Sequence, residues 1–330
     1  MKKLVFFFAL LCSSSLVAQF GYNAASGNGI ESATNTASGI RSFAVGEFTT
    51  ASGGHSTAMG YYTTASGPYS TAVGTSTTAS GDWSTAMGEF TEASGDASTA
   101  MGYNSTASGP YSTAMGSQTT ASGNYSTAVG FQTTASGDFS TASGAATTAE
   151  DYFTFAIGVH NKTDETPNPD SFSYQNTAFV IGNGGYDSEG NYVGTSDTFS
   201  NALEVLFDGT TTIAGDLNIN SDARLKANII SLGSTLSKLL QIDGKTYTMK
   251  KDANHKKKIG LLAQDIEKVF PELVTETNDI KSVNYQGLVP VLINAMKEQD
   301  DKITKQQQEI DTYKKELDEL KTMVKQLMSK

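Results

Sequence analysis

Residues 53–66 read G-G-H-S-T-A-M-G-Y-Y-T-T-A-S, and variants of this stretch recur along much of the chain. The shared unit is G-x-x-S-T-A-[MV]-G-x-x-T-T-A-S. Its A-S-G element ends at glycines spaced 14 residues apart, namely Gly39, Gly53, Gly67, Gly81, Gly95, Gly109, Gly123 and Gly137. A second glycine follows the same period, at Gly46, Gly60, Gly74, Gly88, Gly102, Gly116, Gly130, Gly144 and Gly158. This period is too short for a helix–turn–helix repeat but fits two short strands and two turns. It predicts one coil of a β-solenoid or β-roll per unit.

Two further rows follow the same period. Alternation along a strand places Thr57 and Met59 on one face of S-T-A-M, and Ser56 and Ala58 on the other. The Met59 position predicts a continuous apolar ladder formed by Val45, Met59, Val73, Met87, Met101, Met115, Val129 and Ile157. A mostly aromatic row consists of His55, Tyr69, Trp83, Ala97, Tyr111, Tyr125, Phe139 and Phe153. Because one narrow coil cannot bury so many rings, we expect this row to pack between chains of an oligomer.

The motif S-T-A-[MV]-G followed by T-T-A-S-G resembles the head repeats of trimeric autotransporter adhesins, over about residues 25–158. The resemblance implies a homotrimeric parallel β-roll on a bacterial surface, with a host or surface glycan or protein as receptor. An alternative is a repeat module that binds glycans or ice through its aromatic or threonine rows. Against ice binding, the threonines are adjacent, whereas a flat one-sided array needs T-x-T spacing.

The N-terminus has the pattern of a secretory signal peptide. Lys2 and Lys3 precede the apolar run 4–11 and a small-residue segment that ends near residue 19. Cys12, the single cysteine, falls inside this segment. No later stretch has the roughly 18 apolar residues that a membrane-spanning helix needs. We therefore expect a secreted or cell-surface protein without a transmembrane segment in its mature chain.

Charge changes abruptly at Ser221. Residues 20–220 contain 18 acidic residues but only Arg41 and Lys162 as basic ones, whereas residues 221–330 contain 16 acidic and 19 basic residues. Such an acidic body argues against nucleic acid or an anionic membrane as a partner. It also offers no cleft with two converging carboxylates of the kind that a glycosidase needs. No catalytic activity is expected in the body.

The segments after the repeats show mixed patterns. Residues 159–220 contain expected strands at 177–182, 202–208 and 210–215, and resemble the β-rich necks of phage tail proteins. Further on, residues 225–240 have helical or mixed spacing, 244–250 and 257–263 are typical of two strands, and 265–270 of a short helix stopped by Pro271. His255 has no cysteine or second histidine near it in sequence, so no metal site and no cofactor are expected.

The C-terminal stretch, about residues 286–330, has the heptad pattern of a coiled coil. One row is Val289, Met296, Ile303, Ile310, Leu317 and Val324, and the other is Leu292, Gln299, Gln306, Tyr313, Leu320 and Leu327. Since no sequence remains to cover this stripe, partner helices must do so. We expect a trimer seam formed by Val289, Leu292, Met296, Ile303, Ile310, Leu317 and Val324.

Three motifs after residue 220 resemble the endosialidase-type intramolecular chaperone domain of phage tailspikes and tail fibres. They are S-D-A-R-L-K-A-N-I from Ser221, G-L-L-A-Q-D-I-E-K-V-F-P-E-L from Gly260, and Tyr285 followed by L-V-P-V-L-I. The resemblance implies a domain that trimerises, folds the preceding β fibre, and cuts itself off before a serine with a lysine five residues on. Those positions are Ser221 and Lys226 here, so the implied scissile bond is Asn220–Ser221.

The implied self-cleavage agrees with the known chemistry of serine nucleophiles. A serine hydroxyl needs an adjacent base, and Ser–Lys pairs are a known solution. A lysine can act as that base only when burial or a nearby cation lowers its pKa. Asp222 and Arg224 are candidates to support the pair, or they pair only with each other. The competing interpretation is that Ser221 caps a helix while Lys226 faces solvent.

The sequence thus predicts a mainly β, homotrimeric protein with four parts. These are a signal peptide (1–19), a β-roll head (20–158), a β-rich neck (159–220) and a self-processing chaperone domain (221–330). The expected function is a secreted or surface-displayed adhesin fibre.

Overall fold

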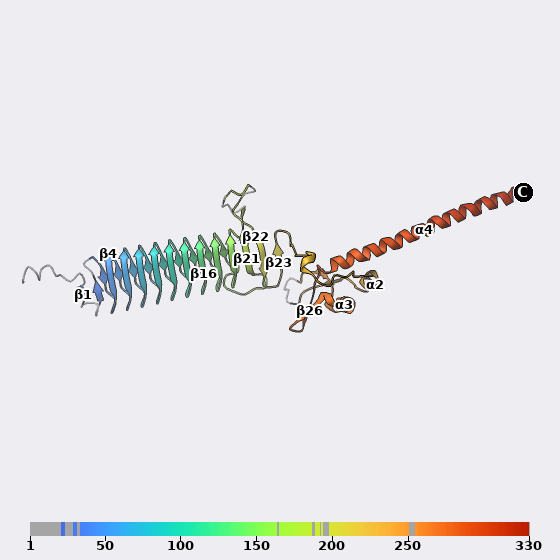
Figure 1. Ribbon diagram of the computed structural model, residues 1–330. Coiled ribbons are helices and arrows are strands. Elements are labelled where there is room, and N and C mark those ends of the chain that lie inside the picture. The colour runs from blue at the N-terminus through green and yellow to red at the C-terminus, as the bar shows by residue number, and fades with distance from the viewer. Residues whose placement is uncertain are drawn as a thin grey trace, which may run out of the picture. The chain divides into compact units, whose positions relative to one another are not determined.

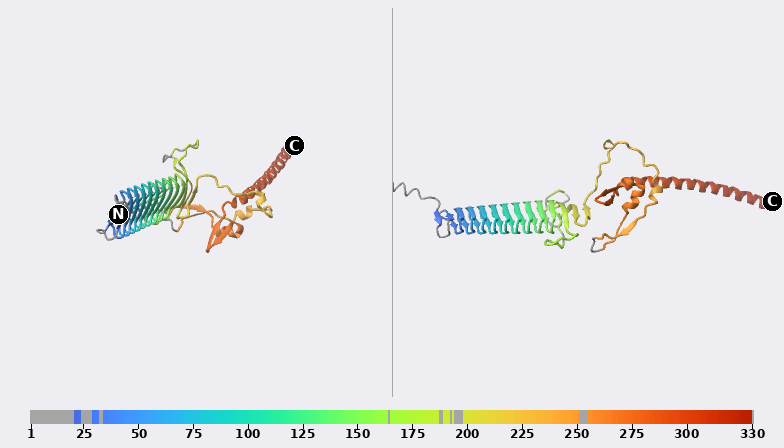
Figure 2. Two further views of the ribbon diagram at one scale, coloured as in Figure 1. Left: turned by 60° about the vertical axis from the view of Figure 1, so that its left-hand side comes forward. Right: turned by 90° about the horizontal axis from the view of Figure 1, so that it is seen from below.

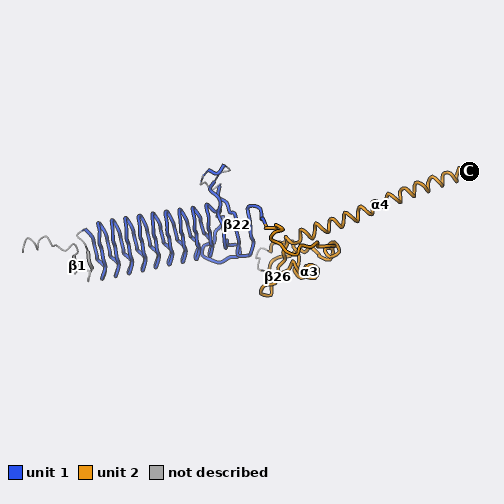
Figure 3. Tube along the Cα trace, in the orientation of Figure 1, with its two compact units in different colours: residues 1–218 blue, residues 219–330 orange. Residues whose placement is uncertain are grey.

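The structure is a computed structural model that describes residues 21–23, 29–31, 34–163, 165–186, 189–191, 193, 198–250 and 255–329. The expected signal peptide, with Cys12, lies outside the described residues. The chain divides into two compact units, residues 1–218 and 219–330, and each is described by itself (Figure 3).

Each repeat of the first unit forms one coil with a five-residue strand, a turn, a two-residue strand and a second turn. The long strands are β4 (Phe43–Glu47), β6 (Thr57–Tyr61), β8 (Thr71–Thr75), β10 (Thr85–Glu89), β12 (Thr99–Tyr103), β14 (Thr113–Ser117), β16 (Thr127–Phe131), β18 (Thr141–Ala145) and β20 (Phe155–Val159). The short strands are β3 (Thr36–Ala37), β5 (Thr50–Ala51), β7 (Thr64–Ala65), β9 (Thr78–Ala79), β11 (Glu92–Ala93), β13 (Thr106–Ala107), β15 (Thr120–Ala121), β17 (Thr134–Ala135) and β19 (Thr148–Ala149).

The long strands stack into one parallel sheet and the short strands into another, as the blue to green coils show in Figures 1 and 2. Within the described residues the first sheet has 14 strands and the second has nine. The register advances by one repeat per coil, as in Thr85↔Thr99 and Ala86↔Ala100. Backbone hydrogen bonds therefore run along the solenoid axis. The sheets confirm the parallel β-solenoid that the sequence period predicts.

Other strands extend the long-strand sheet at both ends. Before the first coil, β2 pairs in parallel with β4, and β1 pairs antiparallel with β2. In the neck, β21 continues the parallel stack from β20, while β22 and β23 add as antiparallel strands. The bounds are β1 (Gly21–Asn23), β2 (Gly29–Glu31), β21 (Thr177–Asn183), β22 (Asn201–Leu206) and β23 (Thr211–Ile213). The three neck strands form in the stretches where the sequence predicts strands.

The interior of the solenoid consists almost entirely of alanine. Two alanines per coil, such as Ala58 and Ala65, are fully buried, and serine and threonine side chains such as Ser56 and Thr63 fill the corners. Only small side chains fit between two sheets joined by such short turns. Met59, by contrast, is 40% exposed. The predicted apolar ladder therefore lies on the outer surface of a single chain, on the face opposite to the alanine core.

The aromatic row forms a stacked column along one turn of each coil. Its members have left-handed backbone conformations, with φ of 59° at Tyr69 and 56° at Tyr125, a region that bulky residues rarely enter. The rings lie face to face: Tyr111 and Tyr125 have centroids 4.7 Å apart and planes 1° apart. The column is thus built within one chain, although its rings remain half exposed. Packing of this row between chains stays a prediction.

Asparagine side chains cap both ends of a row of buried threonines. One repeat before Thr49, Asn35 Oδ1 accepts a hydrogen bond from Thr49 N (2.8 Å) and Asn35 Nδ2 donates to Gly46 O (2.9 Å). One repeat after the last buried threonine, Asn161 Oδ1 accepts from Thr148 N (2.7 Å) and its Nδ2 donates to Thr148 O (2.9 Å). The side-chain amides replace the backbone partners that a further coil would supply.

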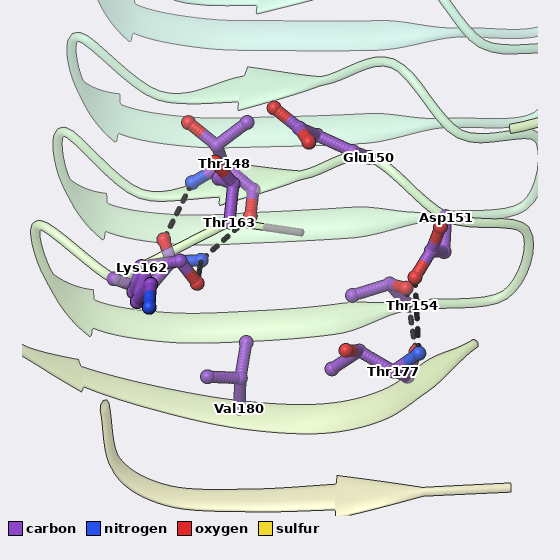
Figure 4. A pocket seen from close by; sticks show the side chains of 9 residues that line it. Thr148, Glu150, Asp151, Thr154, Lys162, Thr163, Thr177 and Val180 are labelled. Atoms are coloured by element: carbon purple, nitrogen blue, oxygen red, sulfur yellow. Dashed lines mark hydrogen bonds between the residues drawn. The ribbon is translucent and has the colours of Figure 1, made fainter. Parts of the chain in front are cut away.

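Asp151 stands one repeat after Gly137, where the row of A-S-G glycines ends, and it attaches the neck to the last coil (Figure 4). Its Oδ1 accepts from Asn168 N (2.7 Å) and its Oδ2 from Thr177 N (3.0 Å), while Thr154 Oγ1 donates to Thr177 O (2.6 Å). Burial, and next the charge of Asp151, raise the pKa of Glu150 beside it. The cavity among these residues is about 20 Å³, which is room for about one water molecule. It is too small to bind a substrate.

Glycine is required where successive coils approach most closely, which gives a test of the stacking. Gly102 has φ +113°, and a Cβ built there would lie 2.0 Å from the carbonyl oxygen of Gly116. We expect Gly102→Ala to destabilise the solenoid by about 3 kcal/mol or more, because both the backbone strain and the clash must be relieved. Gly54 is the matched control, since a Cβ there meets nothing within 4 Å. Denaturant unfolding of both variants checks the expectation, and equal stability of the two would contradict it.

The second unit is a small α+β structure. Its elements are the 3₁₀ helices η3 (Ala223–Leu225) and η4 (Pro271–Leu273), the helices α2 (Leu236–Leu239), α3 (Ala263–Val269) and α4 (Leu288–Met328), and the strands β24 (Lys245–Tyr247), β25 (Lys258–Gly260), β26 (Val274–Thr277) and β27 (Ile280–Val283). The β24/β25 hairpin and α3 confirm the predicted elements, whereas the β26/β27 hairpin was not predicted. Its core is the cluster Ile266, Phe270, Leu273, Leu288 and Val291.

The helical or mixed pattern expected over residues 225–240 is mostly wrong. Only α2 is α-helical in this stretch, and η3 covers its first residue. Asn228 (φ +54°) and Gly233 (φ +65°) adopt left-handed conformations that interrupt a right-handed helix.

Candidate functional site

Ser221 and Lys226 lie side by side in the second unit. Lys226 Nζ donates a hydrogen bond to Ser221 Oγ at 2.8 Å. The turn of η3 between them brings the two side chains together: Leu225 N donates to Asp222 O (3.0 Å) and Lys226 N donates to Ala223 O (3.1 Å). Five residues of extended chain would keep the two groups well apart. A nucleophile and a candidate base are therefore in hydrogen-bond contact.

Both side chains of this pair face solvent in the single chain. In this contact the Lys226 amine is the donor, whereas a general base must accept the hydroxyl proton. The pair has the required geometry but not the water-free surroundings in which a lysine accepts a proton.

Asp222 and Arg224 bind each other. Arg224 Nη2 lies 2.6 Å from Asp222 Oδ2, and Arg224 Nε donates to both carboxylate oxygens at 3.1 Å. These bonds, with one from Arg224 N, lower the pKa of Asp222. Asp222 also caps η3 through the bond from Arg224 N. Among the described residues neither side chain forms a hydrogen bond with Ser221 or Lys226, so they shape the turn that carries the pair.

The long helix α4 has two distinct apolar faces. Leu288, Val291 and Ala295 are buried against the core of the same chain. The row predicted as a trimer seam is exposed instead, with exposed fractions that include 54% at Val289 and 46% at Ile310. The remaining seam residues Leu292, Met296, Ile303, Leu317 and Val324 are exposed as well. No described part of the chain covers this stripe.

A carboxylate clamp, absent from the sequence-based expectations, joins α2 to α4. Glu298 accepts hydrogen bonds from Ser234 Oγ (2.6 Å), Thr235 N (2.5 Å) and Leu236 N (3.2 Å), which are donors at the start of α2. Thr235 Oγ1 also donates to Val291 O at 2.9 Å. The clamp connects the segment that follows the Ser–Lys pair to the long helix.

The Glu298 clamp predicts that the stability of this unit depends on pH. Hydrogen bonds from Ser234, and then from Thr235, lower the pKa of Glu298 below its ordinary value of 4.5. A carboxyl group whose pKa is lowered by folding stabilises the folded state at pH values above its ordinary pKa. This stabilisation is lost as the pH falls through the lowered pKa of the folded state. We expect Glu298→Gln to lower the unfolding midpoint of this unit at pH 7, and the difference from wild type to shrink as the pH falls below 4.5 and through the lowered pKa of the folded state. Thermal unfolding at a series of pH values checks this; a difference that persists unchanged at low pH would contradict it.

The described residues contain neither a metal site nor a membrane-spanning helix. Within the part of the chain that the structure describes, no group of three or more His, Cys, Asp and Glu side chains lies close enough to hold a metal ion. Among the same residues, no helix is both long and apolar enough to cross a bilayer.

Comparisons with known families match both units. A family model described as the YadA head domain repeat matches residues 37–63, 65–91 and, in overlapping windows, 84–160. A model described as the chaperone of endosialidase matches residues 221–275. The chain therefore carries adhesin-type head repeats followed by a chaperone domain of the endosialidase type.

Two phage proteins are similar to parts of the chain. The long tail fiber protein Gp37 of Salmonella phage S16 is 35% identical over 120 residues, and that of Escherichia phage AR1 is 30% identical over 100 residues. These matches cover 33% and 28% of this chain. The chain spans only 15% and 9% of the length of those relatives.

Proposed function

We propose that this chain is a secreted or surface-displayed homotrimeric fibre of the adhesin type. Its C-terminal domain acts as a trimerisation chaperone and then removes itself by cleaving the Asn220–Ser221 bond. The observation that carries the proposal is the 2.8 Å hydrogen bond between Lys226 Nζ and Ser221 Oγ, directly after the scissile bond. The matches to head repeats and to the chaperone domain support the same order of parts.

The cleavage proceeds in two steps. Ser221 Oγ attacks the carbonyl carbon of Asn220 as Lys226 takes the hydroxyl proton. The C–N bond to Ser221 breaks, and its nitrogen receives that proton from Lys226, which leaves an ester between Asn220 and Ser221 Oγ. Water then hydrolyses the ester. The products are a new carboxyl terminus at Asn220 and a fragment that begins with the amine of Ser221.

Trimer formation is the step that activates the pair. In the single chain both side chains are exposed to water, whereas a lysine that acts as a base needs burial or a neighbouring cation. Neighbouring chains that exclude water would favour the neutral amine. Cleavage would then follow only correct assembly, and the fibre would remain folded through kinetic stability.

Self-association has two apolar surfaces to use. The exposed stripe on α4 has the heptad spacing of a coiled coil and polar Gln299 and Gln306 at two seam positions, which can fix register. On the head, the ladder that includes Met59 and Met87 is exposed at 40% and 39%. Contiguous apolar rows of this kind mark interaction surfaces.

Dependence of cleavage on chain concentration tests the proposal. Chains refolded from denaturant at a series of concentrations are expected to cleave faster as concentration rises, because assembly precedes reaction. A time course on denaturing gels measures the rate. A rate that is independent of concentration, in chains that are still monomeric by light scattering, would contradict activation by assembly.

A further inference from the structure

The stacked aromatic column of the head is interrupted at one position. His55, Tyr69 and Trp83 form one stack, with centroids 4.8 Å and 5.9 Å apart and planes 3° and 7° apart. The second stack runs from Tyr111 through Tyr125 to Phe139, with separations of 4.7 Å and 4.9 Å, and ends at Phe153. Ala97 stands between the two stacks, where the column has no ring.

The backbone keeps the coil spacing across this interruption. Ala97 N donates to Asp82 O and Tyr111 N donates to Asp96 O, both at 2.7 Å, as at the equivalent turns of other coils. Ala97 has the same left-handed conformation as its neighbours, with φ of 53°. Trp83 and Tyr111 are therefore two coils apart, about 9.5 Å along the axis at 4.7–4.9 Å per strand. Among the described residues, Trp83 stacks only on Tyr69 and Tyr111 only on Tyr125.

The result is a gap in the stacked column, here called the Ala97 slot, with Trp83 one repeat before it and Tyr111 one repeat after it. Trp83 is 62% exposed and Tyr111 56%, compared with 53% at Tyr69 and 51% at Tyr125, which each have a ring on both sides. Within each stack, Tyr69, Tyr125 and Phe139 have a ring on both sides. At Ala97 two ring faces are available to a ligand.

The rim of the slot is acidic. Asp82 and Asp96 precede Trp83 and Ala97 in their turns, and Asp96 Oδ1 accepts from Asp82 N at 3.2 Å. No described group donates a hydrogen bond to Asp96 Oδ2. A carboxylate oxygen at the edge of an aromatic slot can accept hydrogen bonds from hydroxyl groups of a ligand.

The aspartates beside the aromatic column indicate that the column faces solvent in an oligomer. Asp82, Asp96 and Asp138 lie along the column, and residues 20–220 offer only Arg41 and Lys162 as partners from any copy. Burying unpaired carboxylates between chains would cost several kcal/mol each. The apolar ladder on the long strands consists of uncharged residues, with carboxylates only at Glu47 and Glu89 at the ends of two strands, and is the better surface for association.

We propose that the Ala97 slot binds one hexopyranose ring of an uncharged glycan. The C–H groups of a pyranose carry partial positive charge and pack on the negative faces of aromatic rings, here those of Trp83 and Tyr111. A chair-shaped ring fills the roughly 9.5 Å between two stacked coils better than a flat group, which needs about 7 Å. The acidic rim accepts bonds from hydroxyls and repels sialic and uronic acids.

The inference deepens the proposed adhesive role and rests on it, but not on the cleavage reaction. In a fibre with several copies, weak single slots gain apparent affinity through multivalent binding. Binding of the assembled head and processing at Ser221 are measured separately, so one can fail without the other.

The test fills the slot instead of emptying it. In Ala97→Tyr the new ring has the backbone conformation and the stacking neighbours that other coils of the column already use, so the variant is expected to fold and assemble. The matched control is Ser76→Tyr. Ser76 lies on the other turn of its coil with φ of 52°, between Tyr62 and Phe90 one repeat before and after it. This position differs from the Ala97 slot because Thr75 precedes it in place of an aspartate, and Phe90 packs edge-on against Tyr103. Each full-length protein is applied to immobilised neutral oligosaccharides of glucose, galactose, mannose and N-acetylhexosamine.

We expect the wild type and Ser76→Tyr to bind at least one of these probes, and Ala97→Tyr to bind it at least tenfold more weakly. Equal binding by Ala97→Tyr, or no binding by an assembled wild-type protein, would overturn the proposal. Loss of assembly in Ala97→Tyr but not in Ser76→Tyr would also overturn it, because the column would then lie between chains. Free arginine and choline are tested in parallel, and slot-dependent binding of these cations without any sugar would overturn the ligand class.

Discussion

Replacing Ser221 with alanine is expected to stop self-cleavage completely, so that the full-length chain accumulates as an assembled oligomer. The substitution removes the hydroxyl that Lys226 Nζ contacts at 2.8 Å and leaves no nucleophile beside the Asn220 carbonyl. Lys226→Ala keeps the hydroxyl but removes the base. For either variant we expect the cleavage rate to fall by at least about 10³-fold, since the members of such a unit act together. Assembly should persist, because it depends on apolar surfaces and not on the reaction.

Matched controls separate the chemistry from general damage. Ser231→Ala and Lys250→Ala change exposed residues of the same types in the same unit, and both should process normally. Lys226→Arg keeps the positive charge but cannot release a proton, so it should also fail to cleave. Denaturing gels of purified protein give the fraction cut. Normal processing in Ser221→Ala would falsify the assignment of the nucleophile.

The double substitution Ile303→Asn with Ile310→Asn is expected to abolish trimer formation. Both side chains are exposed in the single chain, at 53% and 46%, so the change should leave the fold of one chain intact. In a coiled coil they would bury two unpaired amides per chain, at about 1–3 kcal/mol each, and lose the apolar contacts as well. Without a trimeric nucleus, the slow long-range pairing of the β-solenoid should lead to aggregation.

The control for this variant is Gln308→Asn with Lys315→Asn. These positions have the same seven-residue spacing but lie on the side of the helix away from the heptad row, so the seam is untouched. The loss of helix propensity is at least as large as in the test variant, because Gln and Lys are better helix formers than Ile. Light scattering with size-exclusion chromatography, in the Ser221→Ala background that keeps the helix attached, measures the oligomeric state. A soluble, folded trimer of the Ile303→Asn, Ile310→Asn chain would contradict the role of the seam.

The repeats could be predicted from sequence because their period leaves few structural choices. Two glycines per 14 residues require a short coil, and the regular offset requires an in-register stack. The alternation of side chains along the long strands does not by itself show which face of the sheet lies inside the solenoid. The structure places Ala58 inside and Met59 outside, because only alanine-sized groups fit between the sheets. Asn35 and Asn161, which replace threonine at the ends of a buried row, were a detectable signal of where the stack begins and ends.

The second unit was less predictable because its contacts join distant residues. Thr235 and Glu298 are 63 residues apart, and nothing in the sequence indicates that the Glu298 carboxylate caps the start of α2. The Ser–Lys pair could be proposed from motif resemblance, but not the 3₁₀ turn that brings its side chains together, which Asp222 caps by accepting a hydrogen bond from Arg224 N. The period of the aromatic row was visible in the sequence; its left-handed turns and face-to-face stacking were not.

The most direct measurement of the central claim is the intact mass of the purified wild-type products, with N-terminal sequencing of the smaller one. Self-cleavage at the proposed bond predicts two species, a head that ends at Asn220 and a fragment that runs from Ser221 to Lys330. A correctly assembled protein that keeps its full length, or a small fragment that begins at another residue, would contradict the account.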